Sequence, residues 1–278
     1  MPDSRPLITR REDGFPRIMG VINITPDSFF EDSRSNNLSE TIKIANLMID
    51  NGAEWLDIGG ESTRPGATPV GVEEEISRVI PVIKELRKKF PDVGISIDTR
   101  RAKVAELALK EGVHMVNDVS ALGDVGMLDV IKQSNCYICL MHMKGIPENM
   151  QNNPLYDDVI IEVKEMLNEK VKLLIDEGIN AERIIVDPGI GFGKSLEHNL
   201  SLLKSGRNIV PNDKIGLMWG VSRKSMFSEL LGRAEPNDRL AGTLGIASIS
   251  RLKGVDIIRV HDVAEHADMF RAISALED

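Results

Sequence analysis

The chain has 278 residues, of which 42% are hydrophobic and 28% are charged, and its formal net charge is -9. This length suits a globular protein with a large buried core, and one α/β barrel commonly fills about 250 residues. The acidic balance argues against a general nucleic-acid-binding protein, which would carry a basic excess, so any anionic ligand must be bound by a local group of cations.

The chain begins with a predicted N-terminal extension, residues 1–16, ahead of the first strand. It carries charges but no apolar stretch, so it does not have the pattern of a secretory signal. No apolar run approaches the roughly 20 residues that cross a bilayer. We therefore expect a cytoplasmic protein that binds neither membranes nor nucleic acid.

Eight short, β-rich segments follow along the chain. They are IMGVINI at 18–24, EWLDIGG at 54–60, VGISIDT at 93–99, HMVNDVS at 114–120, YICLMHM at 137–143, RIIVDPGI at 183–190, IGLMWGVS at 215–222 and DIIRVHD at 256–262. Longer amphipathic segments separate them, and the clearest helix predictions are 39–53, with Ser39 as its cap, 72–90 and 156–178.

This alternation predicts a parallel sheet with crossover helices, because each strand pattern is followed by a helical one. Strand cores such as 183–190 are apolar on both faces, as a sheet covered by helices requires. Eight such units indicate a single (β/α)8 TIM barrel, and no linker or low-complexity tract divides residues 1–278. An open, doubly wound sheet is the alternative.

The two cysteines, Cys136 and Cys139, form a C-x-x-C motif inside one predicted strand. Residues three apart in a strand point to opposite faces, so the two sulfurs diverge. A zinc site would need about four ligands, and the sequence contains no second Cys/His pair. We interpret both cysteines as core residues.

Polar residues follow nearly every predicted strand at its carboxyl end, where barrel enzymes place their sites. They include Asn23, Asp57, Asp98, Asn117, Asp118, His142, Asp187, Arg259 and His261. Each one alone is explained equally well as the cap of the next helix. Their convergence on one rim favours a polar cup, because several charges there are costly to bury without a purpose. His142, between two methionines, is the exception and is interpreted as a packed, hydrogen-bonded residue.

The cup predicts a ligand with two unlike halves. Asp98, Asn117 and Asp187 offer hydrogen-bond acceptors and one amide, which suits a flat heterocycle that presents amino and ring N–H groups. A cationic group suits a phosphate or diphosphate, and it comprises Arg64, Lys224, Arg259 and His261. Asn23 adds an oxygen ligand for a magnesium ion that bridges the phosphates.

Several blocks in this order resemble the dihydropteroate synthase family. They are IMGVINITPDSFF, DIGGESTRPGA, SIDT, NDVSA, MHMKG, DPGIGFGKS, GVSRKSM and RVHDV, and they extend over almost the whole chain. The resemblance implies a (β/α)8 barrel, usually a homodimer. It also implies the condensation of 6-hydroxymethyl-7,8-dihydropterin diphosphate with 4-aminobenzoate to 7,8-dihydropteroate, with release of diphosphate.

The resemblance also implies roles for individual residues. The pterin would be held by Asp98, Asn117, Asp187 and Lys224, with Asn23 as the Mg²⁺ ligand. The diphosphate would be bound by Arg259 and His261, with Thr63 and Arg64 contributing from the loop Thr63–Ala67. The 4-aminobenzoate site would include Ser225 and the loop Thr25–Phe30, and Phe192 would be a further substrate-binding residue. Asp98, Lys224, Arg259 and His261 would act as catalytic groups, by electrostatics rather than covalently.

The stretch DPGIGFGKS, residues 187–195, looks like a phosphate-binding loop but does not fit one. The Walker pattern requires a glycine where Pro188 stands, and the dinucleotide fingerprint fails as well. Asp187 is therefore its expected functional residue. The chain departs from the family in the loop DSFFEDS, which has fewer glycines, and at Ala121, where Gly is commoner; both departures concern loop mobility and sulfonamide sensitivity.

Two other functions would use the same pterin-binding residues, Asp98, Asn117 and Asp187. One is a barrel that transfers a methyl group from methyltetrahydrofolate to a corrinoid, and the other is a non-catalytic pterin-binding protein. The first has no use for STRPG, SRKS and RVH together, and the second would be favoured by loss of Asn23, Arg64, Lys224 or Arg259, all of which are present.

Overall fold

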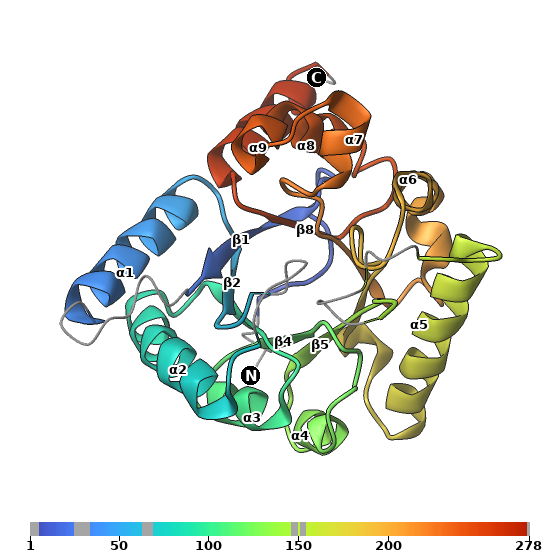
Figure 1. The fold of residues 1–278 in the computed structure, drawn as a ribbon. Helices are drawn as coiled ribbons and strands as arrows, with labels where there is room; N and C mark the ends of the chain where they lie inside the picture. Colours follow the sequence, from blue (N-terminus) through green and yellow to red (C-terminus); the bar gives the residue numbers. More distant parts are fainter. Residues whose placement is uncertain (1–5, 25–33, 63–68, 146–149, 151–153, 277–278) are drawn as a thin grey trace.

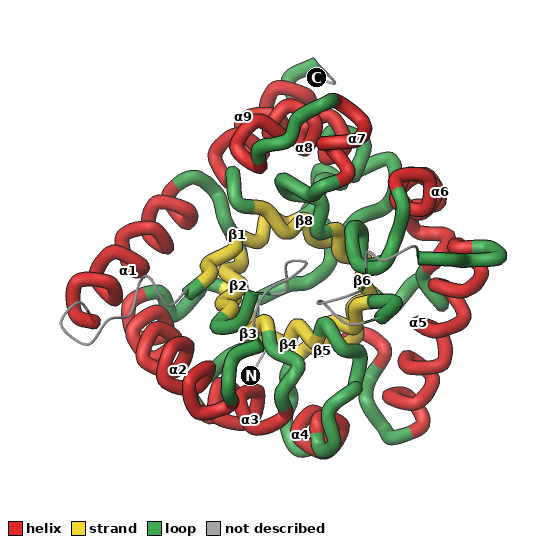
Figure 2. The backbone as a smooth tube through the Cα atoms, viewed as in Figure 1, coloured by secondary structure: helices red, strands yellow, loops and turns green. Residues whose placement is uncertain are grey.

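The computed structural model describes residues 6–24, 34–62, 69–145, 150 and 154–276. Within this part of the chain, eight parallel strands pair in sequence order, and β1 closes against β8 (Figures 1 and 2). The strands are β1 Arg17–Asn23, β2 Trp55–Gly59, β3 Gly94–Asp98, β4 Met115–Asp118, β5 Tyr137–Met141, β6 Ile184–Asp187, β7 Gly216–Trp219 and β8 Ile257–Val260. The predicted (β/α)8 barrel is confirmed.

The helices form a ring outside the strands (Figure 2). They are α1 Arg34–Asp50, α2 Val72–Lys89, α3 Ala102–Lys110, α4 Met127–Lys132, α5 Val159–Asp176, α6 Leu196–Ser205, α7 Met226–Leu231, α8 Leu240–Ala247 and α9 Val263–Ser274. Both α7 and α8 lie between β7 and β8. The first helix begins five residues before the predicted cap at Ser39, which lies inside it.

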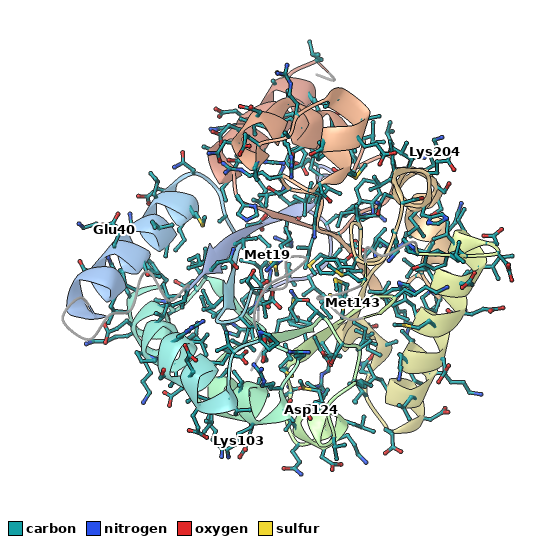
Figure 3. The ribbon with its side chains drawn as sticks, in the orientation of Figure 1. Met19, Glu40, Lys103, Asp124, Met143 and Lys204 are labelled. Carbon is teal, nitrogen blue, oxygen red and sulfur yellow. The ribbon has the colours of Figure 1, made fainter. Side chains whose placement is uncertain are left out.

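The ring buries the apolar face of each helix against the strands. In α2, Val79, Val82, Ile83 and Leu86 are fully buried at helical spacing, and burial of such side chains contributes about 1.5–3 kcal/mol each. Charged side chains such as Glu40, Lys103 and Lys204 lie on the outer helices, whereas Met19 lies near the centre of the barrel (Figure 3).

Alternation along the strands sorts side chains between the barrel interior and the helix layer. The part of the barrel interior toward the amino ends of the strands is apolar. Its buried cluster contains Ile8, Met19, Trp55, Met115, Tyr137, Cys139, Ile185, Met218 and Ile257. Trp55 occupies the space over Gly94, where an added Cβ would lie 2.3 Å from the indole Cδ2. Two residues further along β2 and β3, Asp57 and Ser96 occupy neighbouring register positions.

The end of the N-terminal extension packs across the amino ends of the strands. The indole Nε1 of Trp55 donates a hydrogen bond of 2.9 Å to the carbonyl oxygen of Leu7. Phe15 stacks at a tilt on Phe270 of α9, with ring centroids 4.9 Å apart. In the described part of the chain, no helix combines the length and apolarity that a membrane span requires.

Candidate active site

A cavity of about 860 Å³ opens at the carboxyl ends of the strands. Its lining brings together seven of the residues predicted from the sequence: Asn23, Asp98, Phe192, Lys224, Ser225, Arg259 and His261. Asn117 and Asp187 are buried at the ends of β4 and β6, in register with Asp98 and Met141 of the neighbouring strands. We call Asp57, Asp98, Asn117, Asp187 and Arg259 the polar layer.

Arg259 lies between two carboxylates of the polar layer. Its Nε donates to Oδ2 of Asp57 at 2.6 Å, and its Nη2 donates to Oδ2 of Asp98 at 2.7 Å. Burial lowers the pKa of Arg259, but Asp57 and Asp98 outweigh burial and raise it above its usual value. The guanidinium is therefore a permanent charge, and its Nη1 has no hydrogen-bond partner among the described residues.

Asp98 and Asp187 are the carboxyl groups of the layer whose pKa is raised. Burial raises the pKa of Asp98 to about 7, an effect that Arg259 opposes and Asp57 reinforces. Burial also raises the pKa of Asp187, against the hydrogen bond from the Gly189 N–H. Both groups can therefore change protonation in response to a ligand that brings N–H donors to them.

Asn117 of β4 contacts Asp57 of β2 within the polar layer. Its Nδ2 donates to Oδ2 of Asp57 at 3.0 Å, so one carboxylate oxygen accepts from both Asn117 and Arg259. Asp118, the next residue, points the other way. Its two oxygens accept from the backbone N–H groups of Ser120 and Leu122, which makes it a turn cap rather than a cavity residue. That turn holds Ala121 at φ 49, the left-handed region that favours glycine.

Asp187 is held at the start of a glycine-rich turn. Its Oδ1 accepts a 2.7 Å hydrogen bond from the backbone N–H of Gly189. Gly189 has φ 66, and a Cβ there would lie 1.8 Å from the carbonyl oxygen of His142, so no other residue fits. This turn therefore fixes the position of the Asp187 carboxylate.

Lys194 of the same turn is buried rather than aimed at a ligand. Its Nζ donates to the carbonyl oxygens of Gly189 at 2.9 Å and Phe192 at 3.0 Å, and lies 2.9 Å from Nδ1 of His142. Burial lowers the pKa of Lys194 to about 7. Burial, together with the charge of Lys194, lowers the pKa of His142 to about 3. The structural interpretation of His142 is confirmed.

Lys224 reaches the cavity from the turn after β7. Its Nζ lies 4.0 Å from the ring centroid of Phe192, a cation–π contact. The preceding residue, Arg223, adopts φ 57 and holds Asp262 after β8 through its guanidinium. This left-handed residue turns the chain so that Lys224 and Ser225 border the cavity.

His261 directly follows β8 and lies beside a serine that sequence analysis left without a role. Ser222 accepts a hydrogen bond from the backbone N–H of His261 at 3.2 Å, and its Oγ lies 3.0 Å from the ring Nδ1. Both residues border the cavity, and the buried Ser222 contacts the edge of the His261 ring that carries Nδ1.

Asn23 is the predicted magnesium ligand, and its surroundings fit that role. A Cβ at Gly59 would lie 3.3 Å from Oδ1 of Asn23 and 3.8 Å from Oδ2 of Asp98, so the glycine leaves room beside these oxygens. The described residues contain no cluster of three or more His, Cys, Asp or Glu that could hold a metal. Mg²⁺ suits such a sparse set, because it keeps several waters and binds substrate phosphates.

Thr63, Arg64 and the loops Thr25–Phe30 and Thr63–Ala67 lie outside the described residues. Glu61, just before one of these loops, was missed by sequence analysis. It accepts from the backbone N–H of Val70 at 3.0 Å and from Arg100 and Arg101, and it borders the cavity. Its side chain therefore links Val70 to the two arginines that follow β3.

Asp57 was recognised at a strand end but assigned no role, because the sequence does not reveal that its carboxylate faces Asn117 and Arg259 across the barrel. The predicted core positions of Cys136 and Cys139 are confirmed, since both are buried free thiols.

Comparison with known proteins agrees with this site. The family model described as pterin binding enzyme matches residues 19–261. The dihydropteroate synthase of Escherichia coli K12 is 44% identical over 260 residues, covering 94% of this chain and 91% of its own. That of Synechocystis is 42% identical over 93% of this chain and 89% of its own.

Solved structures match equally well. Dihydropteroate synthase of Yersinia pestis, solved with a sulfonamide drug complex, superposes with a TM-score of 0.88 at 38% identity over 96% of each chain. That of Burkholderia cenocepacia, complexed with 7,8-dihydropteroate, has a TM-score of 0.86 at 37% identity over 98% of this chain and 96% of its own. The chain therefore belongs to the pterin-binding enzyme family, among the dihydropteroate synthases.

Proposed function

We propose that this barrel catalyses the dihydropteroate synthase reaction, the condensation of 6-hydroxymethyl-7,8-dihydropterin diphosphate with 4-aminobenzoate. One observation carries the proposal: a single cavity is bordered by the carboxylate of Asp98 and by the cations Lys224 and Arg259, and Asn117 and Asp187 are buried at the ends of further barrel strands. Relatives solved with 7,8-dihydropteroate or with 4-aminobenzoic acid support the same ligands.

The oxygen acceptors suit the pterin half of the substrate. Asp98 and Asp187 offer carboxylate oxygens, and Asn117 offers its amide oxygen, to the amino and ring N–H groups of an aminopyrimidinone edge. Because these side chains are buried, their hydrogen bonds form in a low dielectric and discriminate strongly against rings that lack the donors. Lys224 adds a donor on the Phe192 side of the cavity.

The cations suit the diphosphate and its departure. Lys224, Arg259 and His261 all border the cavity, where their side chains would stabilise charge on the leaving oxygen. The lone pair of the arylamine forms the new C–N bond as the C–O bond to diphosphate breaks, and the surplus proton leaves the amine. Asp98 stabilises the cation-like methylene carbon through its charge, so the chain needs no covalent nucleophile.

Mg²⁺ is part of the proposal, with Asn23 as its protein ligand; when bound, it would neutralise charge on the diphosphate. Phe192 and Ser225 would border the 4-aminobenzoate site, since both line the cavity beside Lys224. We also propose a homodimer, which exposed apolar residues such as Leu231 on α7 and Leu252 after α8 support. A cytoplasmic location is supported by the free thiols.

The decisive test mixes the chain with the pterin diphosphate, 4-aminobenzoate and Mg²⁺, and follows diphosphate release. Release that depends on the amine supports the proposal, and its absence would overturn it. The variants Lys224→Ala and Arg259→Ala should each lose most of the turnover, whereas Lys204→Ala, a change on the outer helix α6, should keep it.

A further inference from the structure

We propose, resting on the function above, that Asp57 is a positioning residue that orients both halves of the substrate site at once. It acts through Asn117 on the pterin half and through Arg259 on the diphosphate half. Asp57 is fully buried in β2, so it acts through these two neighbours, to which it is hydrogen-bonded.

The geometry concentrates both contacts on one atom. Oδ2 of Asp57 accepts from Nδ2 of Asn117 at 3.0 Å and from Nε of Arg259 at 2.6 Å, although the three residues come from β2, β4 and β8. A carboxylate with two charge-assisted or amide donors on one oxygen has a single favourable orientation. Any movement of Asp57 therefore displaces both partners together.

For Asn117, the contact decides which end of the amide is offered to a ligand. A carboxylate only accepts hydrogen bonds, so the NH₂ group must face Asp57 and the carbonyl Oδ1 must point away from it. Without Asp57, the amide could rotate and present donors instead. Asp57 thus keeps Asn117 in the same acceptor role as Asp98 and Asp187, which selects a ring edge rich in N–H groups.

For Arg259, the contact restricts the plane of the guanidinium. Asp57 accepts from Nε and Asp98 from Nη2, so carboxylates hold two of the three nitrogens. Nη1 is the remaining one and has no partner among the described residues. An arginine fixed at two edges offers its third nitrogen in one direction, which reduces the ordering required when diphosphate binds.

The test separates the two halves by using two small probes. Calorimetry would measure the affinity of the chain for 6-hydroxymethylpterin and, separately, for inorganic diphosphate with Mg²⁺. Asp57→Asn should weaken both affinities by about tenfold or more, because it removes the charge that aligns both donors. The affinity for 4-aminobenzoate, measured with diphosphate and the pterin present, should stay within about twofold.

A matched control is Asp256→Asn. Asp256 is also a buried aspartate paired with an arginine, Arg207, but it sits at the amino end of the barrel, where it accepts from the Leu217 N–H. The Asp256→Asn variant should have a lower melting temperature but an unchanged affinity for both probes. If Asp57→Asn behaves like this control, Asp57 is only structural and the inference is overturned.

A second pair of variants keeps the test decisive if Asp57→Asn does not fold. Asn117→Ala should lower mainly the affinity for 6-hydroxymethylpterin, and its affinity for diphosphate should stay within about threefold of the parent value. In Asn117→Asp, an oxygen acceptor remains, but the donor toward Asp57 is lost, so pterin affinity should still fall about tenfold. Retained pterin affinity in Asn117→Asp would overturn the inference. If the parent chain binds neither probe, the proposed function fails as well, which separates that outcome from a failure confined to Asp57.

Discussion

The hydroxyl of Ser222 bridges the backbone and the ring of His261, with Oγ 3.2 Å from the backbone nitrogen and 3.0 Å from Nδ1. We expect the hydroxyl to accept from the backbone N–H and to donate its own hydrogen to Nδ1, because one oxygen then serves both contacts. In that arrangement a neutral ring carries its proton on Nε2.

Ser222→Ala should weaken the binding of inorganic diphosphate by about 3- to 10-fold, the usual worth of one hydrogen bond. We expect this loss of affinity because the tautomer of His261 is no longer fixed, and we expect the free energy of unfolding to stay nearly unchanged. Calorimetry on the variant would measure it, with Ser248→Ala as control, since the Ser248 hydroxyl is exposed and bonds only the Gly245 carbonyl of its own helix. An unchanged affinity in Ser222→Ala would show that the serine does not orient the ring.

The pterin affinity should rise with pH through about 7. Burial raises the pKa of Asp98 to about 7, and only the ionised form accepts on both oxygens. Between about pH 6 and about pH 8 the ionised fraction, and with it the affinity for 6-hydroxymethylpterin, should increase about tenfold. Asp98→Asn should bind weakly at both pH values; a parent affinity independent of pH would contradict the assignment.

Stability should change in the opposite direction over that range. The pKa of Asp98 is higher in the folded chain than its ordinary value near 4, so the folded state binds more protons between these values. Its contribution to the free energy of unfolding is therefore present below about pH 4 and is lost as the pH rises through about 7. Thermal melts should show a smaller loss between about pH 5 and about pH 8 in Asp98→Asn than in the parent.

Gly189→Ala should destabilise the chain far more than Gly178→Ala. Both glycines have positive φ, 66 and 88, so both variants carry the same backbone strain, on the order of 1 kcal/mol. Only at Gly189 would the new Cβ meet backbone, 1.8 Å from the His142 carbonyl oxygen; at Gly178 nothing lies within 4 Å. Urea unfolding would compare them, and equal losses would mean that the turn after β6 moves aside freely.

Much of this architecture is predictable from the sequence because a parallel barrel leaves two separate signals. Continuous apolar runs such as 183–190 mark strands that are covered on both faces, and the polar residues cluster where those runs end. The start of α1 at Arg34 was missed, since the residues before Ser39 lack apolar periodicity. The two short helices between β7 and β8 carry too few turns for a period to be read.

The partners inside the site were harder to predict. Asp57 and Asp118 look alike in sequence, each a polar residue in or ending an apolar strand, yet one faces the barrel and the other caps a turn. The difference is one of alternation, since Trp55, Asp57 and Gly59 share a face, but alternation is masked where both faces of a strand are apolar. Lys194 gave no signal at all, because its partners are backbone carbonyls that only the folded turn brings together.

Asn23→Ala should remove the magnesium dependence of diphosphate binding while leaving the metal-free affinity unchanged. Asn23 is exposed and borders the cavity, and its Oδ1 lies beside Gly59, where a Cβ would come within 3.3 Å, so the amide oxygen is accessible from the cavity. A single protein oxygen contributes modestly, so we expect a loss of about 3- to 10-fold in the presence of Mg²⁺. Titration of inorganic diphosphate with Mg²⁺ and with a chelator, on the parent and on the variant, would measure this loss.

Asn46→Ala is the control, because Asn46 is exposed on α1 and its side chain bonds Asp50. A parent chain that binds diphosphate equally well with and without Mg²⁺ would contradict the role of Asn23, whereas an equal loss with and without Mg²⁺ in Asn23→Ala would make Asn23 a direct ligand of the diphosphate instead.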